Sequence, residues 1–194
     1  MPDFFLCVPE DYYSEAMQEH IRKNCADVRN AWIYNVINGK VPPSEIVLAR
    51  TAEWTLCRDV HAPEAKWLVV VHDTGLQSLR DLRRCHVPML RQLQTRVRSA
   101  LQTHLGTAAP VHFFLHYLPS TFQLHVHAHV EAVEDARIHS RRHDLKHVVR
   151  NLEKDDLYYT KCVLIANVCK TAKAAGVHTA MSSLAVANLL YKHV

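Results

Sequence analysis

The segment 123–130, QLHVHAHV, carries histidine at three alternate positions, His125, His127 and His129. In an extended strand, every second side chain points to the same face. The three imidazoles would therefore share one face with Gln123, and the apolar residues between them would share the other. The alternation predicts a strand with one face on the core and the other lining a surface or a cleft. Three interpretations fit: a solvent-facing strand, a metal site, or a site for phosphoryl chemistry.

Metal binding is a reasonable hypothesis because histidines at i, i+2 and i+4 can converge on zinc, at zinc–nitrogen distances of about 2.0–2.1 Å. No H-E-x-x-H or D-x-D motif stands nearby to complete a ligand set. The six cysteines include no C-x-x-C pair, and their spacing resembles no zinc module. We therefore predict neither a bound metal nor another cofactor.

Phosphoryl or nucleotidyl transfer needs a neutral imidazole nitrogen that can attack phosphorus and form a covalent phosphohistidine intermediate. The second ring nitrogen must then be protonated and held, often by a backbone carbonyl, so that the tautomer is fixed. A neighbouring imidazole on the same face can stabilise the phosphate oxygens or protonate the leaving group. A strand supplies that alternation on a rigid element, as a catalytic site requires.

The elements that must position this segment follow from hydrophobic periodicity elsewhere in the chain. The clearest is a helix over 84–105, with Pro88 in its first turn and Gly106 at its end. Further helices are predicted over 11–37, 142–153 and from about 179. Strands are predicted over 46–48, 54–57, 67–72, 111–117, 122–130 and 161–168.

Composition narrows the class of protein. The 194 residues suit one domain, or one domain with an arm. A net charge of +4 is compatible with an anionic substrate, but it gives little reason to expect long nucleic acids as partners. There is no run of about 18 apolar residues to span a membrane. The first residues do not read as a signal or transit peptide, so we expect a cytoplasmic or nuclear protein with reduced thiols.

At this point the motifs resemble a known family. QLHVHAHV resembles the signature of the histidine triad superfamily of nucleotide hydrolases and transferases. The segment His116-Tyr-Leu-Pro-Ser120, followed by Leu124-His-Val-His127, resembles the scavenger mRNA-decapping pyrophosphatases. So do Leu79-Arg-Asp-Leu82, Trp32-Ile-Tyr-Asn35 and Asn151-Leu-Glu153. The resemblance runs from about residue 12 to about residue 168 and covers the family's C-terminal catalytic half.

The resemblance implies an α+β fold: a histidine-triad-like antiparallel sheet with helices packed on one face. Residues 1–194 would form a single domain of this kind, with residues 1–40 as an N-terminal helical arm. The family's N-terminal, domain-swapped half is expected to be absent. Because histidine-triad proteins pair across a two-fold axis, a homodimer is expected, with the helices over 84–105 and 142–153 as candidate contacts.

The resemblance also assigns roles, once the register of the triad is chosen. Counted from the Leu-Pro-Ser anchor, His125 is the central nucleophile, His127 takes the third position and Gln123 stands where the first histidine is expected. This register is preferred because the anchor fixes the count. Counted from the three histidines alone, His127 would be the nucleophile. In the anchored register His129 is an additional histidine.

Further site residues follow from the same likeness. His116 and Ser120 would lie toward the phosphates. Trp32 matches the tryptophan that stacks on methylated guanine, a cationic base that prefers an aromatic face. Core packing under the first helix is the alternative role for Trp32. Asp59 matches a residue near the nucleotide, and His61 stands where a lysine is expected.

Guanine recognition departs from the family pattern at one more position. The glutamate expected to contact the guanine edge aligns with Pro42, and Glu45 lies three residues further on. The loss of that carboxylate would leave guanine donors unpaired, at about 1–3 kcal/mol for a buried group.

The leading hypothesis is a nucleotide pyrophosphatase that hydrolyses a nucleoside polyphosphate, with residual mRNA cap as a candidate substrate, through a nucleotidyl-histidine intermediate. One alternative is a hydrolase of dinucleoside polyphosphates or phosphoramidates. The other is a non-catalytic scaffold that binds nucleotide or protein on the same fold, which the changes at Gln123, Pro42 and His61 favour.

Overall fold

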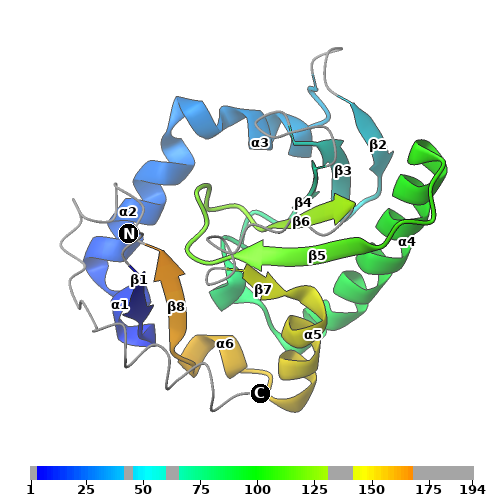
Figure 1. Ribbon diagram of the computed structural model, residues 1–194. Coiled ribbons are helices and arrows are strands. Elements are labelled where there is room, and N and C mark those ends of the chain that lie inside the picture. The colour runs from blue at the N-terminus through cyan, green and yellow to red at the C-terminus, as the bar shows by residue number, and fades with distance from the viewer. Residues whose placement is uncertain (1–3, 42–45, 60–65, 131–141, 168–194) are drawn as a thin grey trace.

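The computed structural model describes residues 4–41, 46–59, 66–130 and 142–167. Its centre is an antiparallel six-stranded sheet in the order β2-β3-β4-β6-β5-β7 (Figure 1). The strands are β2 Val47–Arg50, β3 Trp54–Arg58, β4 Lys66–Val71, β5 Val111–His116, β6 His125–Val130 and β7 Arg142–Asp144. With its flanking helices, this sheet confirms the predicted α+β class.

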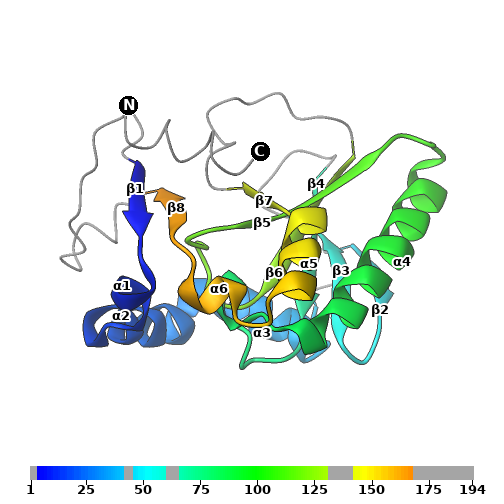
Figure 2. The same cartoon turned by 90° about the horizontal axis from the view of Figure 1, so that it is seen from below.

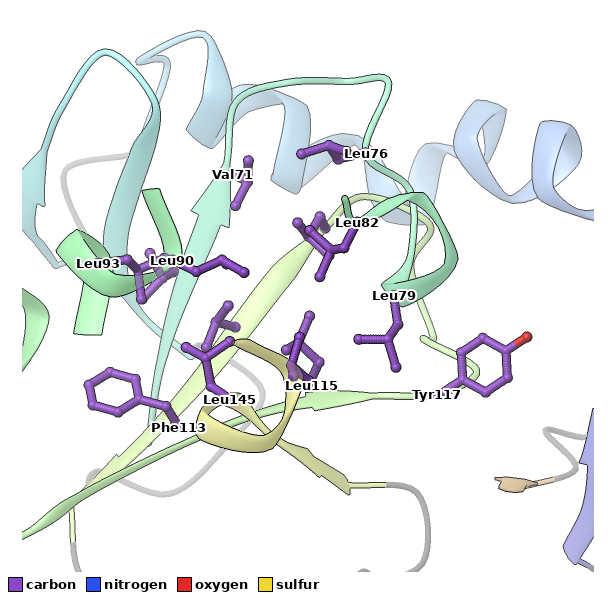
Figure 3. Close-up of a cluster of buried hydrophobic side chains, with 14 of the residues drawn as sticks. Val71, Leu76, Leu79, Leu82, Leu90, Leu93, Phe113, Leu115, Tyr117 and Leu145 are labelled. Carbon is purple, nitrogen blue, oxygen red and sulfur yellow. The ribbon is translucent and has the colours of Figure 1, made fainter. Parts of the chain in front are cut away.

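Two amphipathic helices, α4 (Val87–Leu105) and α5 (Leu145–Lys154), pack against one face of the sheet (Figure 2). The apolar stripe of α4 is buried at Val87, Leu90, Leu93, Val97 and Leu101. Gly106 ends the helix in the left-handed conformation at φ 61°. Figure 3 shows side chains of both helices meeting those of β5, among them Phe113. No helix in the described ranges is long and apolar enough to cross a bilayer.

The N-terminal arm is segmented where one helix over 11–37 was predicted. It consists of α1 (Pro9–Tyr13), α2 (Glu15–Ala26), the 3-10 turn η1 (Val28–Asn30) and α3 (Ala31–Ile37). Ser14 and Asp27 break the helix because each begins a new element: the Ser14 hydroxyl accepts from the Met17 amide, and the Asp27 carboxylate from the Arg29 amide.

The last segment of the arm, α3, packs against the opposite face of the sheet from α4 and α5. Its side chains form a second apolar cluster over β3 and β4, which consists of Ile33, Val36, Cys57, Leu68 and Val70. The prediction of helices on one face therefore describes α4 and α5, while α3 covers the β3–β4 half of the other face. The β6–β5 half of that face carries the alternating histidines.

Outside the main sheet, the short strand β1 (Phe4–Cys7) pairs with β8 (Leu164–Asn167). Two 3-10 turns, η2 (Leu79–Asp81) and η3 (Arg84–His86), lead into α4, and α6 (Tyr158–Lys161) leads into β8. Figure 1 shows β1, β8, α1 and α2 together on the side of the molecule away from α4. The predicted strand over 161–168 is confirmed at 164–167, whereas β1 was not predicted.

Arg80, in η2, is completely buried and joins these peripheral pieces to the sheet. Its guanidinium donates to the carbonyls of Cys7 at 2.8 Å, Tyr159 at 2.9 Å and Cys162 at 2.6 Å, and to the Tyr117 hydroxyl at 3.0 Å. Within the described ranges no carboxylate pairs with it. The Leu79-Arg-Asp-Leu82 motif therefore has a structural role, because its arginine connects β1 and α6 to the main sheet.

Candidate functional site

The alternation predicted for segment 123–130 is present in β6. Val126, Ala128 and Val130 lie in the main core. The histidines lie on the other face of the sheet, which they share with their partners on the neighbouring strands. Val70 is paired with His125, and Leu68 and Phe114 are paired with His127. Only 9% of the surface of His125 and 4% of that of His129 are exposed, so the interpretation of a solvent-facing strand is wrong for these two residues.

His125 is held in one tautomer. Its Nδ1 lies 2.7 Å from the backbone carbonyl oxygen of Gln123. Because a carbonyl can only accept a hydrogen bond, Nδ1 carries a proton, and in the neutral ring the lone pair is then on Nε2. The ring also lines a small pocket, formed by Gln77, Ser78, Leu79, Leu115, His116, Pro119, Gln123, Leu124 and His125. This is the arrangement that nucleophilic attack by Nε2 requires.

Gln123 is fixed in orientation next to His125. Its side chain is 1% exposed, and Nε2 donates to the carbonyls of Val71 at 2.8 Å and Asp73 at 3.0 Å. Two carbonyl partners on one side identify the amide nitrogen without ambiguity. The other atom, Oε1, is buried and accepts no hydrogen bond from any described group. Gln123 can therefore offer a lone pair, but it has no proton to transfer.

His116 and His127 form a pair beside His125. Their ring centroids are 4.2 Å apart, and the centroids of His125 and His127 are 5.2 Å apart. The structure thus brings together three of the predicted imidazoles, with Gln123 at the edge of the group. Such an arrangement can hold phosphate oxygens and pass a proton to a leaving group.

Phe114 is a central residue of this cluster that sequence reasoning missed. Its ring stacks on His127, with centroids 5.0 Å apart and planes 3° apart, and meets His129 edge-on at 4.8 Å. The Arg142 guanidinium lies 4.4 Å from the Phe114 centroid. Since β5 lies between β6 and β7, the Phe114 ring separates His127 from Arg142 and limits the rotation of the imidazole. The sequence carries one signal for this role: Phe114 alternates with His112 and His116, so the three side chains share one face of a strand.

His129 lies further along β6 than the pocket. Burial lowers its pKa to about 4, and the nearby charges of Arg142, Lys66 and His112 act in the same direction. It is therefore neutral near pH 7. The role predicted for His129 in substrate binding stays a prediction.

Acid should destabilise the fold through His129. The pKa is 6.5 in the unfolded chain and about 4 in the folded protein, so the unfolded state takes up the proton first as pH falls. The contribution of neutral His129 to the free energy of unfolding is fully present above pH 6.5 and is lost as pH falls toward 4. At about 1.4 kcal/mol per pKa unit, the loss reaches about 3 kcal/mol. Urea unfolding at several pH values measures it.

In that experiment His129→Gln should flatten the pH dependence in this window. His147→Gln, at an exposed position of α5, serves as the control and should leave the slope unchanged. An unchanged slope in the His129 variant would show that other groups cause the acid sensitivity. One such group is His143, whose pKa is also lowered by burial and by Arg80.

The predicted base-binding residues lie on neighbouring elements. Trp32 is half-buried on α3 and packs against the second apolar cluster, as its alternative role in the core requires. Asp59 follows β3, is half-buried and donates its amide to the Lys66 carbonyl at 3.1 Å. His61 lies outside the described residues, as do Pro42 and Glu45. Ser120 is exposed, in the loop between β5 and β6.

Metal binding finds no support in the part of the chain that the structure describes. No group of three histidine, cysteine or acidic side chains there is close enough to hold an ion.

Comparison with known proteins identifies relatives. A family model described as "Scavenger mRNA decapping enzyme C-term binding" matches residues 31–143. Proteins named m7GpppX diphosphatase are similar to this chain: that of Sus scrofa is 30% identical over 165 residues, 78% of this chain and 48% of the relative. That of Homo sapiens is 29% identical over 166 residues, 79% of this chain and 48% of the relative. The chain spans about half the length of the curated relatives it matches.

Among solved structures, the aprataxin ortholog Hnt3 in complex with DNA has a TM-score of 0.47 and 14% identity, covering 77% of this chain and 92% of that one. Hnt3 in complex with DNA and guanosine has a TM-score of 0.42 and 13% identity, covering 77% of this chain and 93% of that one.

Proposed function

Since this chain belongs to the scavenger mRNA-decapping family, by a match over 113 of its 194 residues (31 to 143), we propose that it is a nucleotide pyrophosphatase of the histidine triad type. It would hydrolyse a phosphoanhydride bond of a nucleoside polyphosphate through a nucleotidyl-His125 intermediate. The observation that carries this proposal is the hydrogen bond from His125 Nδ1 to the Gln123 carbonyl, which in the neutral ring leaves the lone pair on Nε2. The position of His125 on the pocket supports it as well.

The proposed reaction has two steps. In the first, His125 Nε2 forms a bond to phosphorus while the bond from phosphorus to the bridging oxygen breaks. The departing phosphate oxygen takes a proton from His127, whose ring centroid lies 5.2 Å from that of His125, or from His116, which is paired with His127. In the second step, water attacks the phosphorus, the P–N bond breaks and the water proton passes to an imidazole. A nucleoside monophosphate leaves, and His125 returns to its initial state.

Gln123 changes which groups of the site can transfer a proton. An amide cannot deliver a proton to the leaving group, so His127 and His116 carry that role alone. The Oε1 atom remains free to accept a hydrogen bond from a donor, such as the attacking water. Loss of a histidine at position 123 therefore fits a modified hydrolase as well as a binding protein.

The substrate we propose is a residual mRNA cap or a short capped fragment. The relatives are named for action on m7GpppX, and Trp32 packs against the second apolar cluster, which includes Val70, the residue paired with His125. A cationic methylated base prefers a tryptophan face. Pro42 and His61 replace residues expected in the family, so the selectivity for methylated over unmethylated guanine should be weaker than the family pattern implies. A comparison of the two substrates measures that selectivity.

A labelled-substrate experiment tests this function. Cap dinucleotide labelled in the phosphate next to methylguanosine should produce an acid-labile phosphohistidine adduct in a rapid quench, followed by release of labelled nucleoside monophosphate. Unmethylated and adenine dinucleotides form the comparison panel, and a stronger reaction with the adenine compound would favour the dinucleoside polyphosphate hydrolase. Tight binding of all three without adduct or product would instead support the non-catalytic scaffold.

We also propose that the protein acts as a homodimer in the cytoplasm or nucleus, as the family resemblance implies. The outward surfaces of α4 and α5, which are joined by the Arg91–Glu153 ion pair, are the candidate contact. Light scattering of the purified chain would give one subunit mass if the proposal of a dimer is wrong.

A further inference from the structure

The N-terminal arm contacts the loop that leads into β6. Asn24, in α2, donates from Nδ2 to the Ser120 carbonyl at 3.0 Å and accepts at Oδ1 from the Phe122 amide at 3.0 Å. The Cys25 thiol reaches the Phe122 carbonyl at 3.4 Å. One carbonyl and one amide as partners fix which end of the Asn24 side chain is nitrogen. The side chain thus pairs with the loop as a neighbouring strand would.

A second asparagine extends the contact to α3. Asn30 accepts at Oδ1 from the Thr121 hydroxyl at 3.0 Å and donates from Nδ2 to the Asn24 carbonyl at 2.8 Å. Asn30 directly precedes α3, the helix that carries Trp32. The two asparagines and the loop 120–122 therefore form one hydrogen-bonded unit, which we call the arm–loop clamp.

The other end of α3 is also held. Arg50, at the end of β2, donates to the Val36 carbonyl at 2.7 Å, to the Ile37 carbonyl and to the Thr55 hydroxyl at 2.9 Å. A cation at the carboxyl end of a helix also complements its dipole. The helix is thus attached to the sheet at one end and to the loop before His125 at the other.

From this geometry we infer that Asn24 and Asn30 are positioning residues of the proposed reaction. The clamp sets the position of the loop 120–122 and of Trp32 relative to His125, so that the phosphate side and the base side of the site are held by one unit. The inference rests on the proposed function. Neither asparagine lines the pocket, so both act through the groups they hold.

Asn24→Asp tests the inference because the substitution keeps the acceptor for Phe122 and replaces the donor to Ser120. Near pH 8 the carboxylate faces the Ser120 carbonyl and repels it, so the loop should shift. A misplacement of about 1 Å can reduce turnover about 100-fold, and we expect kcat to fall by about 10- to 100-fold with a smaller change in KM. Protonation restores the donor, and an aspartate titrates near about pH 4, so the ratio of variant to wild-type kcat should rise as pH falls below about 5.

Gln92→Glu is the matched control, because it makes the same change from amide to carboxylate at an exposed position of α4. Its kcat should equal that of the wild type at every pH. Amide hydrogen exchange of residues 120–122 is a second readout that does not need activity. Compared with the wild type at the same pH, exchange in Asn24→Asp should be about tenfold or more faster at high pH and should approach the wild-type rate at low pH.

The outcomes separate the two proposals. Wild-type turnover with a kcat ratio near one across the pH range would overturn the positioning role and leave the proposed function intact. If the wild type turns over no phosphoanhydride, the proposed function fails, and exchange alone decides the clamp. Unchanged exchange in Asn24→Asp would then show that the clamp does not hold the loop.

Discussion

Replacing His125 with asparagine is expected to reduce hydrolysis of the best substrate by about 10⁴-fold or more, the scale of loss on removing a nucleophile. The substitution removes the attacking Nε2 atom but keeps an amide that can donate to the Gln123 carbonyl. The fold should therefore persist, with a free energy of unfolding within about 1 kcal/mol of the wild type. Steady-state kinetics and urea unfolding measure the two effects.

His127→Asn provides the comparison. Loss of an acid–base partner reduces the rate by about 10²- to 10⁴-fold, so labelled adduct should still form on His125 in that variant, more slowly. Full activity of the His125 variant, together with loss of adduct in the His127 variant, would transfer the nucleophile to His127 and restore the register counted from the three histidines.

Arg80→Met should destabilise the protein by about 3–5 kcal/mol, because four buried oxygen atoms lose their donor at once. Methionine fills much of the same space but donates nothing to the four oxygen atoms that Arg80 now satisfies. A buried acceptor left without a donor loses about 1–3 kcal/mol. Urea unfolding at neutral pH measures the change.

Arg96→Met, at an exposed position of α4, is the control and should change stability by less than about 0.5 kcal/mol. If Arg80→Met were as stable as the wild type, the free-energy cost of desolvating the guanidinium would equal the free energy that its hydrogen bonds contribute. The connection of β1 and α6 to the sheet would then depend on apolar packing.

Local patterns were sufficient for the elements that form the centre of the site. The period of two in segment 123–130 predicted β6 and the face on which His125 lies, because a strand allows no other arrangement of alternate residues. The stripe over 84–105 predicted α4, whose end at Gly106 depends only on local backbone conformation.

Elements that depend on distant partners were missed. β7 consists of three residues at the start of a segment predicted as helix, and it exists because Phe114, Leu115 and His116 offer it a free edge. β1 is a strand only because residues 164–167 pair with it. One helix is predicted for the arm because its apolar spacing continues through Ser14 and Asp27, whose capping bonds are visible only in the structure.

The site shows the same division. The sequence identified Gln123, His125, His127 and His116, and the structure brings them together. It could not show that the Gln123 amide is oriented by the carbonyls of Val71 and Asp73. The contribution of Asn24 was also invisible, because its partners are almost one hundred positions away in the chain and are backbone atoms.

The pairing of Phe4 with Asn167 has a consequence for how the protein is made. A ribosome translates about 5–20 residues per second, so β1 leaves the exit tunnel about ten seconds or more before its partner strand exists. During that interval its backbone amides and carbonyls form an open edge that other nascent strands can join. The Arg80 guanidinium likewise waits for the carbonyls of Tyr159 and Cys162. Chaperone binding to residues 4–7 of the growing chain would cover this edge until synthesis reaches β8.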